Sequence, residues 1–401
     1  MDGTPEHSGD SFDVLIIGGG NAGLSVAARL LRRGVVSVGV VEPLAVHTYR
    51  PLLSYVGGGQ ASRSSAERTQ ESVTPDGCTW VQDSAVGVDA ESQTVRCRGG
   101  RVYRYTDVVL APGLVPDEDE LDDVFTAVDT DAVASNYLDH AEKTWQLVES
   151  MSAGHAVFTV PRPPVSCTGT TLKPLFLAAA YWSRMGRLDD IDITLVVDRP
   201  DLLGVAEIDD RLRGYLDEIG VQVLSNATVT GVHASERKLA VRVGDDVEQK
   251  LPYDLLHLVP PFRAPRWIEA SGLADSAAHG VVDIDPKTFR HRVHANVWSL
   301  GDAANVDTDP SGGAIRRQSA ILVDNLLAAR HGGPFKEYDG YTVAPIATDA
   351  HQLMFGEFDR TGLTSSLPSF LDPLKPRRWA WAFDRYGLPQ MYWKLILKGR
   401  L

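Results

Sequence analysis

Three glycines near the start of the chain, Gly18, Gly20 and Gly23, have a spacing suited to binding phosphate groups. They form a G-x-G-x-x-G pattern between an apolar run at 12–17 and a helical pattern that continues to Arg33. The first glycine permits a tight turn, and the second lets backbone N–H groups approach a pyrophosphate. The third lets the helix pack on the strand, with the helix N-terminus facing the phosphates. The pattern therefore predicts a strand, a glycine turn and a helix that bind a dinucleotide.

A carboxylate follows where the ribose of such a ligand would lie. The apolar run 35–41, a second predicted strand, ends in Glu42, about 20 residues after the glycine pattern. A carboxylate at this place can accept hydrogen bonds from ribose hydroxyls. A glycine-rich turn without a ligand is the alternative, but it leaves the strand, the helix and the acid unexplained.

Cys167 is the second residue that could carry chemistry. It precedes a helix predicted over 172–185, and Lys173 follows six residues later. A helix N-terminus and a nearby ammonium group both lower the pKa of a thiol, so we predict a thiolate with nucleophilic or redox chemistry. The alternative is a small buried apolar residue. Cys78 and Cys97 flank strand-like segments and are assigned structural roles.

The turn that contains Cys167 also bears on the electron donor. It follows a predicted strand at 155–160, where a domain that binds NAD(P)H has a glycine-rich pyrophosphate turn. Here the segment 161–173 carries prolines and side chains in place of that turn. We therefore expect that this part of the chain does not bind NAD(P)H in the usual way, and that electrons come from another donor.

A second pair of cofactor residues, Gly301 and Asp302, ends an apolar run near the other end of the chain. A helical pattern through Ala329 follows, and Gly313 and Ala314 lie at its start. The arrangement resembles the second FAD fingerprint of flavoproteins with two dinucleotide-binding folds. In those proteins the aspartate binds the ribityl and pyrophosphate region, and the helix N-terminus faces the flavin pyrimidine. The alternative is an ordinary turn at the end of a strand.

The resemblance implies that the cofactor is FAD and that the fold is α/β, with two Rossmann-like domains. The FAD domain is expected to be discontinuous, over 10–115 and 285–340, because 108–113 resembles the strand that closes the first FAD segment. Strands at 155–160 and 191–197 and helices at 172–185 and 205–219 predict a second domain over 125–280 that carries Cys167. A C-terminal region, 341–401, completes the chain. Pro51 and Val86 are further residues expected to contact FAD.

Composition narrows the classes of partner. The 401 residues carry a net charge of −14, which disfavours binding to nucleic-acid phosphates. Three cysteines cannot form a disulfide framework, and Met1–Asp10 lacks the basic and apolar regions of a signal peptide. We therefore expect a protein of the cytoplasm. The sequence contains no run of 18 or more apolar residues, so a membrane-spanning helix is not expected.

The C-terminal segment has the opposite charge. From Leu371 onward it has two acids, Asp372 and Asp384, against seven bases: Lys375, Arg377, Arg378, Arg385, Lys394, Lys398 and Arg400. Three of the eight tryptophans, Trp379, Trp381 and Trp393, lie in the same segment. Bases and aromatic residues in this mixture are typical of amphipathic helices in the headgroup layer, so we predict peripheral association with the cytoplasmic face of a membrane. The alternative is a helix that packs on the body of the protein or on the second subunit of a homodimer.

The segment around Cys167, followed by Ala180-Tyr-Trp, is similar to the first redox-cysteine segment of sulfide:quinone oxidoreductases, particularly the mitochondrial type. Similar matches run in order along the chain: 47–59, Tyr338–Pro345, Glu357–Asp359 and Leu388–Trp393. The resemblance implies a membrane-associated FAD enzyme. In that family sulfide attacks a disulfide or trisulfide between two cysteines at the flavin, and electrons pass through the flavin to quinone.

Ala344 occupies the position of the second redox cysteine of that family. The expected disulfide therefore cannot form, and one thiol cannot store two electrons as an internal disulfide. Three hypotheses remain open. The first is an enzyme of this type that oxidises sulfide or another small sulfur donor at Cys167, with Lys173 assisting, and reduces quinone. The second is a flavin-binding homologue without turnover, acting as a sensor or partner subunit, and the third is a flavin reductase with a different donor. We expect no metal site.

Overall fold

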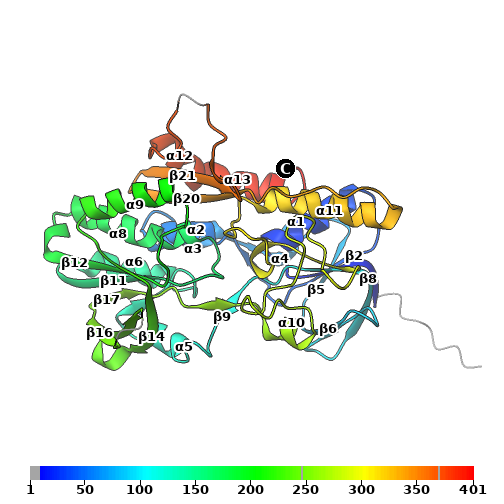
Figure 1. Ribbon diagram of the computed structural model, residues 1–401, viewed down its shortest axis with the longest axis horizontal. Helices are drawn as coiled ribbons and strands as arrows, with labels where there is room; N and C mark the ends of the chain where they lie inside the picture. Colours follow the sequence, from blue (N-terminus) through cyan, green and yellow to red (C-terminus); the bar gives the residue numbers. More distant parts are fainter. Residues whose placement is uncertain (1–9, 245–246, 369–370) are drawn as a thin grey trace, which may run out of the picture.

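The computed structural model describes residues 10–244, 247–368 and 371–401. The segment on which the absence of a signal peptide was judged lies, except for Asp10, outside these residues. Two α/β units lie side by side along the long axis of the molecule, and the C-terminal segment runs across the top of both (Figure 1). No helix among the described residues is long and apolar enough to span a bilayer.

The first unit is built on a seven-stranded sheet. In pairing order its strands are β5 (Cys78–Val81), β2 (Val38–Val41), β1 (Ser11–Ile17), β8 (Val102–Leu110), β7 (Thr94–Cys97) and β6 (Ala85–Asp89), and β19 (Val297–Ser299) also pairs with β8. The pairs among β5, β2, β1, β8 and β19 are parallel, whereas β6, β7 and β8 form an antiparallel meander. Helices α1 (Asn21–Arg32) and α11 (Ile315–His331) pack against each other beside this sheet (Figure 1).

The predicted strand, glycine turn and helix at the start of the chain are confirmed as β1 and α1. The second predicted strand begins later than expected, at Val38 instead of residue 35. Val36 is 85% exposed, so the start of this apolar run belongs to the turn after α1.

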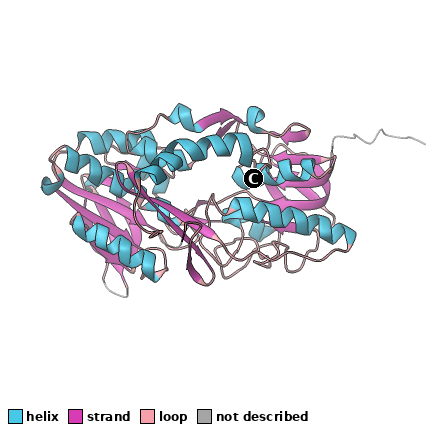
Figure 2. Ribbon diagram, turned by 90° about the horizontal axis from the view of Figure 1, so that it is seen from above, coloured by secondary structure: helices cyan, strands magenta, loops and turns pink. Residues whose placement is uncertain are grey.

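The second unit contains a five-stranded parallel sheet. Its strands pair in the order β10 (Val133–Ala134), β17 (Leu255–His257), β11 (Gly154–Val160), β12 (Ile191–Val197) and β13 (Gln222–Ser225). The helices of this unit are α5 (Val124–Val128), α6 (Ala141–Ser150), α7 (Thr168–Thr171), α8 (Lys173–Arg184) and α9 (Ala206–Glu218), and an antiparallel meander adds β14 (Ala227–His233), β15 (Lys238–Val243) and β16 (Gln249–Pro252). Helices lie beside the strands of this unit (Figure 2). The predicted strands and helices of this unit are thus present, and the α/β class with two Rossmann-like units is confirmed.

Shorter elements lie between the main strands and helices. They are β3 (Val46–Thr48), α2 (Pro51–Gly57), α3 (Arg63–Ala66), β4 (Glu67–Thr69), α4 (Gln70–Val73), β9 (Val115–Pro116), β18 (Phe262–Arg263) and α10 (Arg266–Ala270). Strand β9 pairs with β18 where the chain passes between the units. Residues 264–284 pack into the core of the first unit through Ala264, Ile268 and Leu273. We therefore propose that the second unit ends near residue 263 instead of 280.

The C-terminal region begins with an antiparallel sheet of β20 (Thr342–Asp349), β21 (Gln352–Asp359) and β22 (Gly362–Thr364). A run of short helices follows: α12 (Arg378–Ala382), a π-helical turn (Phe383–Gly387), α13 (Leu388–Met391) and a second π-helical turn (Tyr392–Ile396). Strand β20 packs on α7 and α8, and Met354 and Phe358 of β21 join the core of the second unit. Tyr392 and Leu397 join the core of the first unit, so the C-terminal region holds the two units together.

Candidate active site

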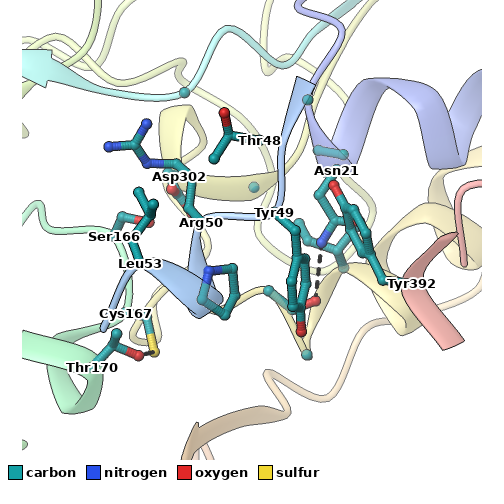
Figure 3. Close-up of a pocket in the computed structure, with 18 of the residues that line it drawn as sticks. Asn21, Thr48, Tyr49, Arg50, Leu53, Ser166, Cys167, Thr170, Asp302 and Tyr392 are labelled. Atoms are coloured by element: carbon teal, nitrogen blue, oxygen red, sulfur yellow. Dashed lines mark hydrogen bonds between the residues drawn. The ribbon is translucent and has the colours of Figure 1, made fainter. Parts of the chain in front are cut away.

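One cavity of about 1390 Å³ extends between the two units and beneath the C-terminal segment. Its walls come from the glycine turn, from α2, from the segment before α7, from the end of β19, and from β20, β21 and the C-terminal helices. Figure 3 shows Asn21 and Tyr392 at one side of it and Cys167 at the other, with Arg50 and Asp302 between them. The residues predicted for cofactor and thiol chemistry are therefore brought together, although they are far apart in the sequence.

The three glycines of the first motif serve different purposes. Gly18 has a φ of +103°, and a Cβ atom there would collide with the carbonyl group of Ala111. A Cβ atom on Gly23 would collide with the carbonyl oxygen of Gly18, so this glycine allows α1 to approach the turn. A Cβ atom on Gly20 would meet no atom within 4 Å and would instead project into free space at the cavity wall. The turn thus leaves room for a pyrophosphate at the place that the motif predicts.

Glu42 lies at the end of β2 and lines the cavity, as the ribose assignment requires. Its Oε2 accepts a hydrogen bond from the backbone N–H of Gly19 at 2.8 Å, and its Oε1 accepts one from the N–H of Leu44 at 2.9 Å. These bonds fix the carboxylate beside the glycine turn. Each oxygen keeps a second lone pair, which is available to a ribose hydroxyl.

The second motif, Gly301 and Asp302, lies close to the glycine turn, because a Cβ atom on Gly301 would be 3.3 Å from the Cβ of Ala22. Gly301 has a φ of +75° and lines the cavity together with Asp302. Burial raises the pKa of the Asp302 carboxyl. Gly313 also lines the cavity, and a Cβ atom there would collide with Val343 of β20. Ala314 is buried at the start of α11 and is absent from the cavity wall. The shape and the donor groups of the cavity therefore suit FAD.

Two further cofactor predictions have different outcomes. Pro51, the first residue of α2, lines the cavity. Val86 lies in β6, is 39% exposed, and is not among the residues of the cavity wall. The pairing order explains the difference, because β8 and β7 separate β6 from the glycine turn that follows β1. The structure does not bring Val86 to the site.

Cys167 is the residue directly before α7 and lines the cavity (Figure 3). Its backbone is left-handed, with a φ of +58°, and its Sγ accepts a hydrogen bond from the hydroxyl of Thr170 at 3.0 Å. Burial, followed by the charge of Asp309, raises the pKa of the Cys167 thiol to about 12. These two causes outweigh Thr170 and Lys173, which lower it. The prediction of a thiolate is therefore wrong for this structure, and the resting group is a neutral thiol.

Lys173 does not serve Cys167 in the way the sequence indicated. Its side chain is fully buried and is not part of the cavity wall. Its Nζ forms an ion pair with Oδ2 of Asp384, 2.8 Å away, in the C-terminal segment. Asp384 lines the cavity. Sequence reasoning missed this aspartate, although its being one of only two acids in a basic segment was a signal that could have found it.

A carboxyl group that sequence reasoning also missed contacts the first residue of α7. Asp309 accepts hydrogen bonds from the backbone N–H of Thr168, at 3.1 Å, and from the Thr168 hydroxyl. Arg199 approaches the same hydroxyl at 3.4 Å. Burial raises the pKa of Asp309 to about 6. This carboxyl group therefore holds the short helix that follows Cys167.

Ala344, the residue that the resemblance assigns to the position of the second redox cysteine, lies next to α7. A Cβ atom built on Gly169 would be 2.5 Å from the Cβ of Ala344, so the two residues are in direct contact. Ala344 is fully buried, while its neighbours Val343 and Pro345 line the cavity. Cys78 and Cys97 lie in β5 and β7 and are absent from the cavity wall. Cys167 is therefore the one cysteine of the three that borders the cavity.

The C-terminal segment is tied to the glycine turn by a buried histidine. The Nδ1–H of His47 donates to the carbonyl oxygen of Gly19 at 3.0 Å, and the hydroxyl of Tyr392 donates to His47 Nε2 at 2.7 Å. Burial lowers the pKa of His47, which favours this neutral form. Trp393 packs on the rings of His47 and Tyr49. The end of the chain is therefore docked on the body of the protein, as the alternative for this segment held.

Part of the C-terminal segment nevertheless faces outward. Trp379 is 50% exposed, Phe383 is 39% exposed and Tyr386 is 57% exposed. Trp379 and Phe383 also line the cavity, so the apolar surface of the segment is continuous with the cavity wall.

Comparison with known proteins gives a consistent family. Residues 12–322 match the model of the pyridine nucleotide-disulphide oxidoreductase family. The mitochondrial sulfide:quinone oxidoreductase of Mus musculus is 31% identical over 97% of this chain and 87% of that protein. The protein of the same name from Dictyostelium discoideum is 33% identical over 96% of this chain and 86% of its own length.

A solved structure supports the fold independently. The sulfide:quinone oxidoreductase of Aquifex aeolicus superposes with a TM-score of 0.81 over 96% of this chain and 91% of that chain, at 16% identity. At this identity the likeness concerns the fold alone. Together with the matches along the whole sequence and the FAD-shaped cavity, it establishes the family. The chain is an FAD-dependent oxidoreductase that belongs to the pyridine nucleotide-disulphide oxidoreductases, on the branch of the sulfide:quinone oxidoreductases.

Proposed function

We propose that this protein oxidises a small sulfur donor, sulfide in the first instance, at Cys167 and delivers the electrons to a membrane quinone. The observation that carries the proposal is that one cavity borders the glycine turn, Cys167 and the C-terminal segment. FAD, when bound, accepts the two electrons that oxidation of the sulfur releases and passes them to the quinone.

Cys167 supports the donor half of the proposal because its Sγ borders the cavity. Formation of one S–S bond between this sulfur and the sulfur of H₂S gives a persulfide and releases two electrons and two protons. The hydroxyl of Thr170 stabilises negative charge on Sγ as the thiol proton leaves. With Ala344 in place of a second cysteine, the sulfur atom taken up by Cys167 must be passed directly to an acceptor that enters the cavity.

The apolar end of the cavity supports the acceptor half. Phe355, Trp379, Phe383 and Leu388 line it, and they provide the largely apolar wall that a quinone ring and its isoprenoid chain need. Because two of these side chains are also exposed on the outer surface of the C-terminal segment, a ligand dissolved in a bilayer has a direct route to the cavity. This favours peripheral attachment of the protein to the cytoplasmic face of a membrane through that segment.

Anaerobic mixing with sulfide tests the donor half. We expect sulfide to bleach the visible absorption of the bound flavin, NADH to leave it unchanged, and the Cys167→Ser variant to lose the response to sulfide, because a hydroxyl is a far weaker nucleophile than a thiolate. Equal bleaching of the wild type and the variant by sulfide would show that Cys167 is structural. Bleaching by NADH alone would favour a flavin reductase with a different donor.

A flavoprotein without turnover is the second candidate, and a specific observation favours it. Ala344 removes one of the two sulfur atoms expected in the family, and the pKa of Cys167 is raised to about 12. A sensor or partner subunit would bind FAD and show no bleaching with either donor. In that case Ala344→Cys, which places a thiol against α7 near Cys167, is the variant expected to restore the response to sulfide.

The proposed attachment to a membrane needs a test that leaves the fold intact. Truncation of the C-terminal segment would remove Tyr392 and Leu397 from the core of the first unit. Replacing only the exposed Trp379, Phe383 and Tyr386 by Ser should instead abolish co-sedimentation with vesicles of anionic phospholipid, since these side chains are the apolar contact. Unchanged sedimentation would show that the attachment lies elsewhere.

A further inference from the structure

A buried group of three polar side chains lies at the acceptor end of the cavity, outside the chemistry assigned to Cys167. The ammonium of Lys173 is 2.8 Å from Oδ2 of Asp384, and the hydroxyl of Tyr55 donates to the same oxygen at 2.6 Å. Lys173 is fully buried, and only 3% of Asp384 and 1% of Tyr55 are exposed. The three residues come from α8, from the first π-helical turn of the C-terminal segment and from α2.

The surroundings of this group fix its geometry. The Lys173 ammonium also lies 5.1 Å from the centre of the Tyr55 ring, and the guanidinium of Arg385 lies 5.9 Å from the same ring. Arg385 donates its own hydrogen bonds to the carbonyl oxygen of Gln60. Removing an ion pair from water is costly, and an apolar pair of similar volume often stabilises a fold as well or better. The stability of the fold alone therefore does not explain the buried ion pair of Lys173 and Asp384.

One carboxylate oxygen of Asp384 accepts no hydrogen bond from the residues that the structure describes. Both hydrogen bonds go to Oδ2, and no hydrogen bond reaches Oδ1 among the residues that the structure describes. The residue borders the cavity beside Phe383 and Leu388, both apolar. An ionised carboxylate accepts hydrogen bonds and cannot donate them. Oδ1 can therefore accept a hydrogen bond from a hydroxyl group of a ligand. It cannot donate a hydrogen bond to a carbonyl oxygen of a ligand.

We propose that Asp384, held by Lys173 and Tyr55, is the polar anchor of the acceptor site and selects the hydroxyl-bearing, reduced form of the acceptor over its carbonyl form. The inference rests on the proposed function, in which this end of the cavity takes a quinone. Tighter binding of the hydroquinone makes reduction of the bound quinone more favourable, by the ratio of the two affinities. Lys173 and Tyr55 are positioning residues, because they act through Asp384.

The test uses two probes that differ only in a hydroxyl group and do not exchange electrons with the protein. They are a decyl-substituted 4-methoxyphenol and the matching decyl-substituted 1,4-dimethoxybenzene, titrated into the FAD-loaded protein while tryptophan fluorescence is followed. Trp379 lines the cavity and Trp381 lies nearby in the same helix, so binding should change their emission. A hydrogen bond to a charged group leads us to expect about tenfold tighter binding of the phenol.

Variants test whether the preference for the phenol depends on Asp384. Asp384→Asn should reduce it below about twofold, and the double variant Lys173→Met with Asp384→Leu, which leaves no buried charge unpaired, should do the same. Asp372→Asn is the matched control, because it makes the same change of charge in the same segment at an exposed pair with Arg211. It should keep the wild-type preference.

The outcomes separate the inference from the function on which it rests. The role of Asp384 is overturned if the wild type binds both probes equally, or if the Asp384 variants keep the preference. Either result leaves the proposed acceptor site unaffected. If neither probe binds the wild type, the acceptor end of the proposed function is wrong and the inference falls with it.

Discussion

The thiol of Cys167 is expected to react with iodoacetamide about 50-fold more slowly at pH 8 than an ordinary cysteine does. Burial and the carboxyl of Asp309 raise its pKa from the ordinary value of 9.0 to about 12. That difference lowers the thiolate fraction at pH 8 about 10³-fold. A thiolate of higher pKa is intrinsically more nucleophilic, which recovers about 20-fold and leaves the net factor of about 50.

The assay is anaerobic alkylation between pH 7 and pH 11, with each cysteine followed separately by mass spectrometry of its peptide. The same protein unfolded in urea provides the reference rate for an ordinary thiol. Because restricted access slows the reaction equally at every pH, the dependence on pH is the diagnostic quantity. The rate at Cys167 should rise about tenfold per pH unit, without a plateau below about pH 11.

Asp309→Asn identifies the source of the effect. Removing the carboxyl charge beside α7 should lower the pKa of Cys167 and raise its alkylation rate at pH 8, while Asp372→Asn at the surface should leave that rate unchanged. A rate that levels off near pH 9 or below in the wild-type protein would refute the reasoning. The pKa of Cys167 would then lie at or below its ordinary value, the direction that its place before a helix and near Lys173 first indicated.

Three further outcomes are expected. Gly20→Val should keep the fold and lose FAD, whereas Gly23→Val should lose the fold, because only the second collides with protein atoms; circular dichroism and flavin absorbance separate the two effects. Tyr392→Phe leaves His47 Nε2 without its donor and should cost about 1–2 kcal/mol of stability, seen as release of FAD at a lower temperature. The raised pKa of Asp309, about 6 against an ordinary 3.8, favours the folded protein at low pH, and this contribution is lost as the pH rises through 6. Relative to Asp309→Asn, the wild type should therefore lose at most about 3 kcal/mol between pH 4 and pH 7 in urea titrations, and a constant difference would contradict the assignment.

What the sequence predicted correctly depends on neighbours along the chain. The glycine turn and the pair Gly301 and Asp302 are local patterns, since strand, turn and helix follow one another within about 20 residues. The reactivity of Cys167 depends on burial and on Asp309, 142 positions later in the chain, and neither is visible in a local pattern. Lys173 was assigned to its nearest candidate partner, but its actual partner lies 211 residues away.

The same reasoning applies to Val86 and to the extent of the second unit. Val86 was expected to contact FAD, and only the pairing order of the sheet shows that two strands separate its strand from β1. The boundary proposed near residue 263 rests on Ile268 and Leu273, which join the first core through contacts between distant segments that a sequence pattern does not show.

Docking of the C-terminal segment on the first core also determines when this protein can become complete during synthesis. Tyr392 and Leu397 leave the ribosome long after β1, yet they fill the core that is built around β1. Nascent domains fold as units from the N-terminus onward. Here the core of the FAD-binding unit cannot be filled until the C-terminal segment has been translated, so its apolar surface is expected to stay exposed during translation of the second unit. Chaperone dependence and late acquisition of FAD are the expected consequences of a core that is closed by residues so distant in the sequence.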